Sequence, residues 1–254
     1  MTEKGKLYIG TSGWVYSDWQ GIFYPQTLPS KEKLPYFARH FKTAEVNYSF
    51  YHLPRAQTYQ NWYSQTPADF LFALKASRFI THIKRLKGVN QAWKVFLENA
   101  LNLKEKLGPI LFQFPPSFKA TQENLERLEK FLKFINSPIG KGSLKSSRFA
   151  FEFRDKSWFD EKIYKLLRKY KAAWVIADSS RYPRADIVTA PFIYIRMHGP
   201  GPMFASKYSK KELWQLAQKI KKWQKEPRDI YCYFNNDFQG YALENARELL
   251  KLAG

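Results

Sequence analysis

The chain has 254 residues and carries 42 Lys and Arg against 22 Asp and Glu, a formal net charge of +20. A chain of this length fits one barrel or two smaller domains. We find no run of about 20 apolar residues and no apolar leader after the charged start 1–6, so we predict a cytoplasmic protein with no membrane partner. The single cysteine, Cys232, excludes an intramolecular disulfide, and we expect it to pack in the core.

The basic excess favours a polyanionic partner, either nucleic acid or an anionic small molecule. Many of the lysines stand beside glutamates, as in 104–106 and 126–130, which is typical of solvated helix surfaces and of proteins from hot environments. The alternative to an anionic partner is therefore a merely basic surface. The sequence names no cofactor and no oligomeric state.

Eight short segments rich in β-branched and aromatic residues recur along the chain, and most end in polar residues. In chain order they are 7–12, 43–48, 70–76, 110–114, 148–154, 173–178, 192–198 and 229–235. Segments with helical spacing of apolar residues separate most of them: 30–41, 91–107, 121–135, 159–170, a helix opened by the Ser209–Glu212 capping box, and 241–252. This alternation predicts an α/β fold, a TIM (β/α)8 barrel, as a single domain over 1–254.

Two connections depart from the regular alternation of strands and helices. Segment 179–190 contains Pro183 and no helical stripe, so we expect the helix there to be short or missing. Segment 137–147 is rich in Ser, Lys and Gly, and we expect it to form a loop that the barrel tolerates as an insertion.

Alternation along each strand predicts which side chains point into the barrel. Phe149, Phe151 and Phe153 suit the helix layer, so Glu152 and Arg154 should point inward. The same reasoning turns Arg196 and His198 inward, and places Asp178 inward together with Trp174 and Ile176. The predicted mouth of the barrel is rich in charge and contains Glu45, Lys75, Glu152, Arg154, Asp178, Arg196 and His198.

These residues suggest acid–base chemistry on an anion, because ionisable groups in a cleft favour a functional site. We predict Glu152, His198 and Lys75 as catalytic residues. We predict seven substrate-binding residues: Arg154, Arg196, Glu45, Asn47, Asp178, Asn235 and Trp14. The Gly199 and Gly201 amides should add hydrogen bonds to a phosphate. The alternative is an internal salt-bridge network without chemistry.

No metal site is predicted. His198 is the histidine that ends a strand directly, whereas zinc hydrolases on barrels use several. The carboxylates Glu45, Glu152 and Asp178 could hold Mg²⁺ or Mn²⁺, but two arginines and a lysine beside them would already neutralise them. The common phosphate-loop, nucleophile-elbow and redox-cysteine motifs are missing from the sequence.

Seven strings in this order and spacing resemble the YecE-like family of uncharacterised TIM-barrel proteins. They lie at 9–14, 45–51, 72–77, 111–116, 152–158, 196–199 and 234–237, and so cover nearly the whole chain. The resemblance implies the barrel and names no activity. Asp155 stands where the family motif often has histidine. The fold invites comparison with the endonuclease IV and xylose isomerase barrels, at the level of fold alone.

Three functions remain open from the sequence. The first is an enzyme that acts on nucleic acid or a nucleotide, such as a hydrolase of phosphoester bonds. The second is an enzyme acting on a sugar or sugar phosphate. The third is a non-catalytic nucleic-acid-binding protein that uses the barrel as a scaffold. Aromatic residues at Trp14, Tyr16, Trp19, Phe50 and Tyr51 could stack on bases in the first case or roof the mouth in any of them.

Overall fold

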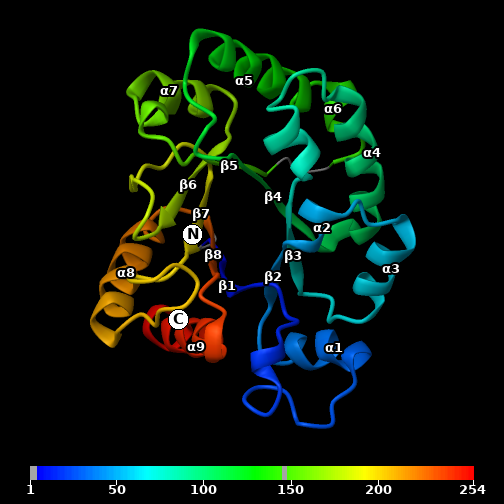
Figure 1. Ribbon diagram of the computed structural model, residues 1–254, viewed down its shortest axis with the longest axis vertical. Helices are drawn as coiled ribbons and strands as arrows, with labels where there is room; N and C mark the ends of the chain where they lie inside the picture. The colour runs from blue at the N-terminus through cyan, green and yellow to red at the C-terminus, as the bar shows by residue number, and fades with distance from the viewer. Residues whose placement is uncertain (1–4, 145–147) are drawn as a thin grey trace.

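Eight parallel strands close into a barrel in chain order, with the last strand paired to the first. The computed structural model describes residues 5–144 and 148–254. The strands are β1 Leu7–Ser12, β2 Thr43–Val46, β3 Leu71–Lys75, β4 Leu107–Gln113, β5 Phe149–Glu152, β6 Ala173–Asp178, β7 Phe192–Met197 and β8 Asp229–Phe234. Helices surround the strands as an outer ring (Figure 1), so the predicted TIM barrel is confirmed.

The helices are α1 Lys33–Ala38, α2 Tyr48–Tyr51, α3 Ala56–Ser64, α4 Asn90–Ala100, α5 Gln122–Ile135, α6 Pro138–Lys141, α7 Glu161–Lys169, α8 Lys210–Trp223 and α9 Tyr241–Ala253. Short 3-10 segments lie at Ser17–Trp19, Ser30–Glu32, Leu101–Lys106, Lys156–Trp158 and Phe238–Gly240, and a π-helical turn at Phe79–Ile83. Among the described residues, none of these helices has both the length and the apolar character needed to cross a lipid bilayer.

The start of helix α8 shows how a local sequence signal sets a helix boundary. Ser209 accepts a hydrogen bond from the Glu212 amide, and the Glu212 side chain accepts one from the Ser209 amide, so the predicted capping box is present. Residues 179–191, all of them described, contain no helix, which confirms the predicted gap between β6 and β7.

Three helices were not predicted. Helix α2 is a single turn of four residues directly after β2, too short to show a helical period. Helix α3 has one buried residue, Tyr59, so its sequence carries little apolar periodicity. Helix α6 occupies part of the predicted loop 137–147, where Ser137 caps a short turn by accepting from the Gly140 amide. Residues 145–147 of that loop, and 1–4 of the charged start, lie outside the described residues.

The barrel separates two packed layers of different composition. Outside the strands, phenylalanines and tryptophans fill the space beneath the helices, as Phe112 does by stacking on Phe151 at a centroid distance of 4.9 Å. Inside, three tyrosines at Tyr194, Tyr231 and Tyr233 pack with alanines and with larger residues such as Leu111 and Phe192. This inner layer fills the lower barrel and supports the charged residues at its C-terminal end.

The prediction for β6 was wrong by one residue. Trp174 and Ile176 pack in the outer layer, while Ala173, Val175 and Ala177 face the barrel interior. The three inner tyrosines leave room there for small side chains only, whereas Trp174 finds partners in Phe153 and Tyr164. A one-residue change of parity moves every side chain of a strand to its other face.

Trp93 gives a test of the outer layer. It is fully buried between α4 and the strands, and its Nε1 donates to the Gly140 carbonyl at 2.7 Å. Replacement Trp93→Ala should lower the free energy of unfolding by about 3–5 kcal/mol, because it leaves a large cavity and an unpaired carbonyl. Urea denaturation checks this result.

The matched control is Trp214→Ala on α8, where the side chain is 54% exposed. This change should stay within about 0.5 kcal/mol of the wild type. Equal effects of the two substitutions would contradict the layer assignment.

Candidate functional site

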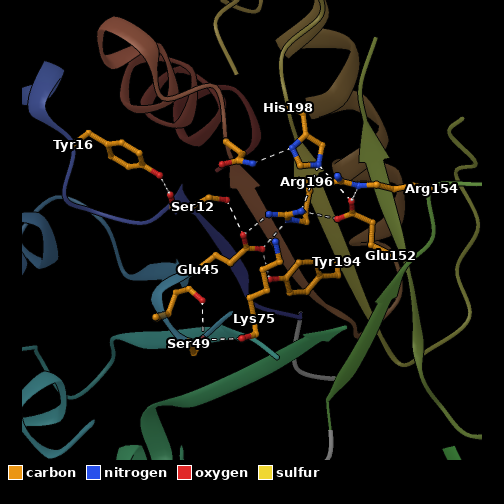
Figure 2. Close-up of polar contacts among 12 residues, drawn as sticks. Ser12, Tyr16, Glu45, Ser49, Lys75, Glu152, Arg154, Tyr194, Arg196 and His198 are labelled. Carbon is orange, nitrogen blue, oxygen red and sulfur yellow. Dashed lines mark hydrogen bonds and ion pairs between the residues drawn. The ribbon is translucent and has the colours of Figure 1, made fainter. Parts of the chain in front are cut away.

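Arg196 lies at the centre of the barrel mouth and binds two carboxylates (Figure 2). Its Nε and Nη2 donate to the two oxygens of Glu45 at 2.9 and 2.7 Å, and its Nη1 donates to Glu152 at 2.6 Å. Arg196 is 1% exposed. All three of its guanidinium nitrogens are therefore committed to partners inside the protein.

The carboxylates of this cluster are held in their charged form. Burial alone would raise the pKa of Glu45, but Arg196 and hydrogen bonds from Tyr194 and Ser12 hold that pKa below its usual value. Burial would likewise raise the pKa of Glu152, which Arg196 and Arg154 hold well below its usual value. Glu152 is thus fixed as a carboxylate that holds two arginines.

His198 is buried beside Arg196 and Glu152. Its Nε2 is 3.8 Å from a Glu152 oxygen, and Asn235 contacts its Nδ1 at 3.1 Å. Burial, together with the charge of Arg196, lowers the pKa of His198. We therefore describe His198 as a neutral side chain whose ring orientation is held by Asn235 and Glu152.

A cavity of about 740 Å³ opens above the cluster at the C-terminal ends of the strands. Its ionisable lining residues come from five elements and their loops: Lys75, Arg78, His82, Arg154, Arg196 and Asp237. Its remaining lining is polar or aromatic: Tyr16, Asn47, Phe50, Tyr51, Gln113, Phe204 and Asn235. Glu45, Glu152 and His198 are almost fully buried and lie beneath this lining.

Lys75 is a cavity residue whose pKa is shifted close to neutral pH. Its Nζ lies 4.0 Å from the centre of the Phe50 ring, and its side chain extends toward the Glu45–Arg196 pair (Figure 2). Burial, and then the charge of Arg196, lower the pKa of Lys75 to about 7. At neutral pH a large part of Lys75 is an uncharged amine, which can accept a proton.

Asp237 is a site residue that the sequence analysis missed. It follows β8 in the loop that leads to the 3-10 segment, and its Oδ1 is buried without a hydrogen-bond partner among the described residues. Burial raises the pKa of Asp237 to about 8. The signal was present in the string Asn235–Asn236–Asp237, but no periodicity extends beyond the strand to show where Asp237 points.

The ten predicted site residues fall into three groups. Lys75, Arg154, Arg196, Asn47 and Asn235 line the cavity. Glu45, Glu152 and His198 form its floor. The other two, Asp178 and Trp14, lie elsewhere.

Asp178 does not join the mouth, because the parity of β6 was misread. It faces outward, where it pairs with Arg184 and accepts a hydrogen bond from the Tyr208 hydroxyl at 2.6 Å. Asp178 therefore links the segment that replaces the missing helix to the loop before α8. Its predicted part in substrate binding at the mouth is wrong.

Trp14 lines a different pocket, of about 440 Å³, next to the main cavity. Its ring meets Trp62 edge to face at 5.5 Å. The two glycine amides predicted to bind phosphate are also occupied: Gly199 donates to the Tyr208 hydroxyl and Gly201 to Ser206 Oγ, both at 2.9 Å. The loop 198–202 is thus organised by contacts within the protein.

Within residues 5–144 and 148–254, no three His, Cys, Asp or Glu side chains lie together as a set that could hold a metal ion. Cys232 is buried in the outer layer, and burial raises the pKa of its thiol. Cys232 is therefore a core residue, as expected from its place between two tyrosines in β8.

Comparison with known proteins identifies relatives over the full length of the chain. Residues 8–254 match the family described as protein of unknown function DUF72. YunF of Bacillus subtilis is 27% identical over 97% of this chain and 94% of its own length. YecE of Escherichia coli is 30% identical over 44% of this chain and 39% of its own length. These matches confirm the YecE-like resemblance.

Solved structures agree with the fold. A DUF72 protein from Thermotoga maritima has a TM-score of 0.85 at 29% identity, covering 97% of this chain and 98% of that one. A family 2 AP endonuclease from Brucella melitensis has a TM-score of 0.55 at 9% identity, covering 94% and 96% of the two chains. At that identity the likeness to the endonuclease concerns the barrel fold alone.

The central ion cluster predicts how stability responds to Arg196→Met. Removing the guanidinium leaves Glu45 and Glu152 buried without their main partner, which should lower the free energy of unfolding at neutral pH by about 3–5 kcal/mol. In the wild type both carboxyl pKa values lie below the unfolded value of 4.5, so their contribution is lost as pH falls. In the variant, burial raises these pKa values, so the deficit should shrink between about pH 7 and pH 5.

Urea denaturation of both proteins across this pH range measures the deficit. The control is Arg168→Met, which removes an exposed pair with Glu161 and should cost at most about 1 kcal/mol at any pH. A deficit for Arg196→Met that is small, or constant with pH, would show that Glu45 and Glu152 do not depend on Arg196.

Proposed function

This chain belongs to the DUF72 family of proteins of unknown function, and from its cavity we propose that it is an enzyme acting on a phosphate-bearing substrate, a nucleotide or nucleic acid. The reaction class we propose is hydrolysis of a phosphoester bond. The single observation that carries the proposal is the excess of positive charge around the cavity at the C-terminal mouth. Active sites of TIM barrels lie at this end of the strands.

The charge count supports an anionic ligand. Lys75, Arg78, Arg154 and Arg196 line the cavity, and its acidic lining residue, Asp237, has a pKa raised by burial to about 8. Beneath the lining, Glu45 and Glu152 supply two negative charges, which Arg196 and Arg154 already balance. Arg78, and Lys75 in its protonated form, add positive charge beyond this balance.

Arg154 is the residue we assign to phosphate binding. Its Nε donates to Glu152 at 2.9 Å, and its guanidinium lies 4.7 Å from the centre of the Tyr182 ring. These two contacts orient the side chain at the cavity wall and leave its terminal nitrogens for a ligand. An arginine held in this way is suited to bidentate binding of phosphate oxygens.

Lys75 and Asp237 are the acid–base pair that fits hydrolysis. Their pKa values, about 7 and about 8, place a neutral amine and a neutral carboxylic acid in one cavity near neutral pH. The Lys75 amine takes a proton from water as the water oxygen bonds to phosphorus. As the P–O bond breaks, the Asp237 carboxyl gives its proton to the leaving oxygen, and both groups then exchange protons with solvent.

Glu152 and His198, two of the three predicted catalytic residues, are assigned a positioning role. Glu152 orients Arg154 and Arg196 through its two oxygens. His198 packs against Phe204, which lines the cavity, and contacts Asn235. In this assignment Glu152 and His198, in the floor of the cavity, contribute to its electrostatic potential. Lys75 and Asp237, in the lining, transfer the protons.

The first test is phosphate binding by Arg154→Ala. Loss of a hydrogen bond to a charged group is worth about 1.5–3 kcal/mol, so the affinity for inorganic phosphate should fall by about ten- to 150-fold. Isothermal titration calorimetry measures it. The control is Arg148→Ala. Arg148 precedes the first residue of β5, at the opposite end of the strand from Arg154, and pairs with Asp229. Its loss should therefore leave phosphate binding intact.

Salt dependence in the same titrations distinguishes the ligand classes. The logarithm of the binding constant of a short oligonucleotide should fall linearly with the logarithm of the salt concentration. The slope should be about −0.7 multiplied by the number of single-strand phosphates that the protein neutralises. An uncharged sugar should show no such slope. If phosphate, nucleotides and oligonucleotides all fail to bind the wild type, the internal ion network without a substrate becomes the better account.

Lys75 gives a second test that needs no known reaction. Labelling of its amine by a small acylating reagent should reach half of its maximal rate near pH 7, because only the neutral amine reacts. Lys42 is the internal control, since its hydrogen bond to Asp69 raises its pKa and keeps it unreactive at that pH. Mass spectrometry reports both sites in one sample.

Added phosphate should slow the labelling of Lys75 and leave Lys42 unchanged. Labelling of Lys75 only at high pH, or without protection by phosphate, would contradict its place in the anion cavity.

A further inference from the structure

We call the cavity of about 740 Å³ above the Arg196 cluster the phosphate cavity, after its proposed ligand. The pocket beside it is built from aromatic side chains. It is about 440 Å³ in volume, and Trp14, Tyr48 and Trp62 form much of its wall. Trp62 meets Trp14 edge to face at 5.5 Å and Tyr48 at 6.4 Å. Of the described residues that line it, none is charged, in contrast to the cavity next to it.

The two spaces are neighbours that share part of their walls. Tyr16 and Asn47 line both of them. Helix α2 runs between them: Tyr48, at its start, lines the aromatic pocket, and Tyr51, at its end, lines the phosphate cavity. A single ligand can therefore occupy both spaces, with an anionic part in one and a flat, apolar part in the other.

The backbone at the shared wall is adapted to this shape. Gly13 has a φ of +93°, and a Cβ at this position would lie 3.0 Å from the Tyr16 hydroxyl. That hydroxyl donates to the Ser12 carbonyl and so fixes the Tyr16 ring. Glycine at position 13 thus lets the chain turn between β1 and Tyr16 without displacing the ring from the wall.

Asn47 supplies a polar group at the junction. Its Oδ1 is buried and has no hydrogen-bond partner among the described residues. A buried amide oxygen left in this state is costly, and an N–H group of a ligand would relieve the cost. Thr58 adds a hydroxyl group to the lining of the same pocket.

We infer that this aromatic pocket is a nucleobase subsite, so that the substrate of the neighbouring cavity is a nucleotide or a single-stranded nucleic acid. This inference rests on the proposed function and selects among its substrates. A sugar ring would present several hydroxyl groups, each needing a polar partner, and the pocket offers few. A base presents a flat π-face with a few edge N–H and carbonyl groups, which matches aromatic walls and one amide.

The experiment compares four ligands by calorimetry: inorganic phosphate, ribose 5-phosphate, AMP and adenosine. The wild type should bind AMP at least about tenfold more tightly than ribose 5-phosphate, the scale of one base–aromatic stack. Adenosine should bind weakly. Tyr48→Ala should remove the preference for AMP while leaving the affinity for ribose 5-phosphate unchanged.

Tyr48 is chosen because its side chain is 52% exposed and its loss should not unfold the barrel. Tyr48→Phe keeps the ring and should keep the preference for AMP. Thr58→Trp, which places a large side chain in the pocket, should abolish the preference as Tyr48→Ala does. Trp214→Ala, an exposed tryptophan on α8, should change none of the four affinities.

The outcomes separate the two proposals. Equal affinities of the wild type for AMP and ribose 5-phosphate, or a preference that survives both Tyr48→Ala and Thr58→Trp, would overturn the nucleobase subsite and leave the phosphate cavity standing. Binding of adenosine that depends on Tyr48, without binding of phosphate, would support the subsite and overturn the proposed function. Failure of all four ligands to bind would overturn both.

Discussion

The two ion pairs of Arg196 are the interaction on which the mouth of this barrel depends. They join β7 to β2 through Glu45 and to β5 through Glu152. Burying three charged groups costs several kcal/mol of desolvation for each ion, which a geometry with every guanidinium nitrogen bonded can offset. Hydrophobic residues could close the barrel at a similar or lower cost, so stability alone does not account for such a cluster.

The cluster also sets the proton affinities around it. Its guanidinium charge adds to burial in lowering the pKa of Lys75 and of His198, and it keeps Glu45 and Glu152 ionised. The fully paired charged groups form the floor of the cavity. Above them, the pKa of Lys75 is lowered to about 7 and the pKa of Asp237 is raised to about 8.

Two aromatic layers hold this arrangement rigid. Tyr194 donates to Glu45 at 2.7 Å from the layer of tyrosines below the cluster, and Tyr233 contacts Thr43 at 2.7 Å in the same layer. Outside the strands, a layer rich in phenylalanine and tryptophan packs beneath the helices. The pocket lined by Trp14 and Tyr48 adds further aromatic side chains beside the main cavity.

The sequence by itself determined the barrel, the gap after β6 and the inward faces of β5 and β7, because strand alternation and helix capping are local properties. Alternation misled at β6, where Asp178 was grouped with Trp174 although the inner face of this strand carries Ala173, Val175 and Ala177. Tertiary structure alone decided that Arg196 meets Glu45, 151 residues away, and Glu152, 44 residues away. It also placed Asp237 in the cavity, since no period continues past the end of a strand. Strands distant in sequence determine how deeply a side chain is buried and which charges surround it. Those two quantities shift its pKa.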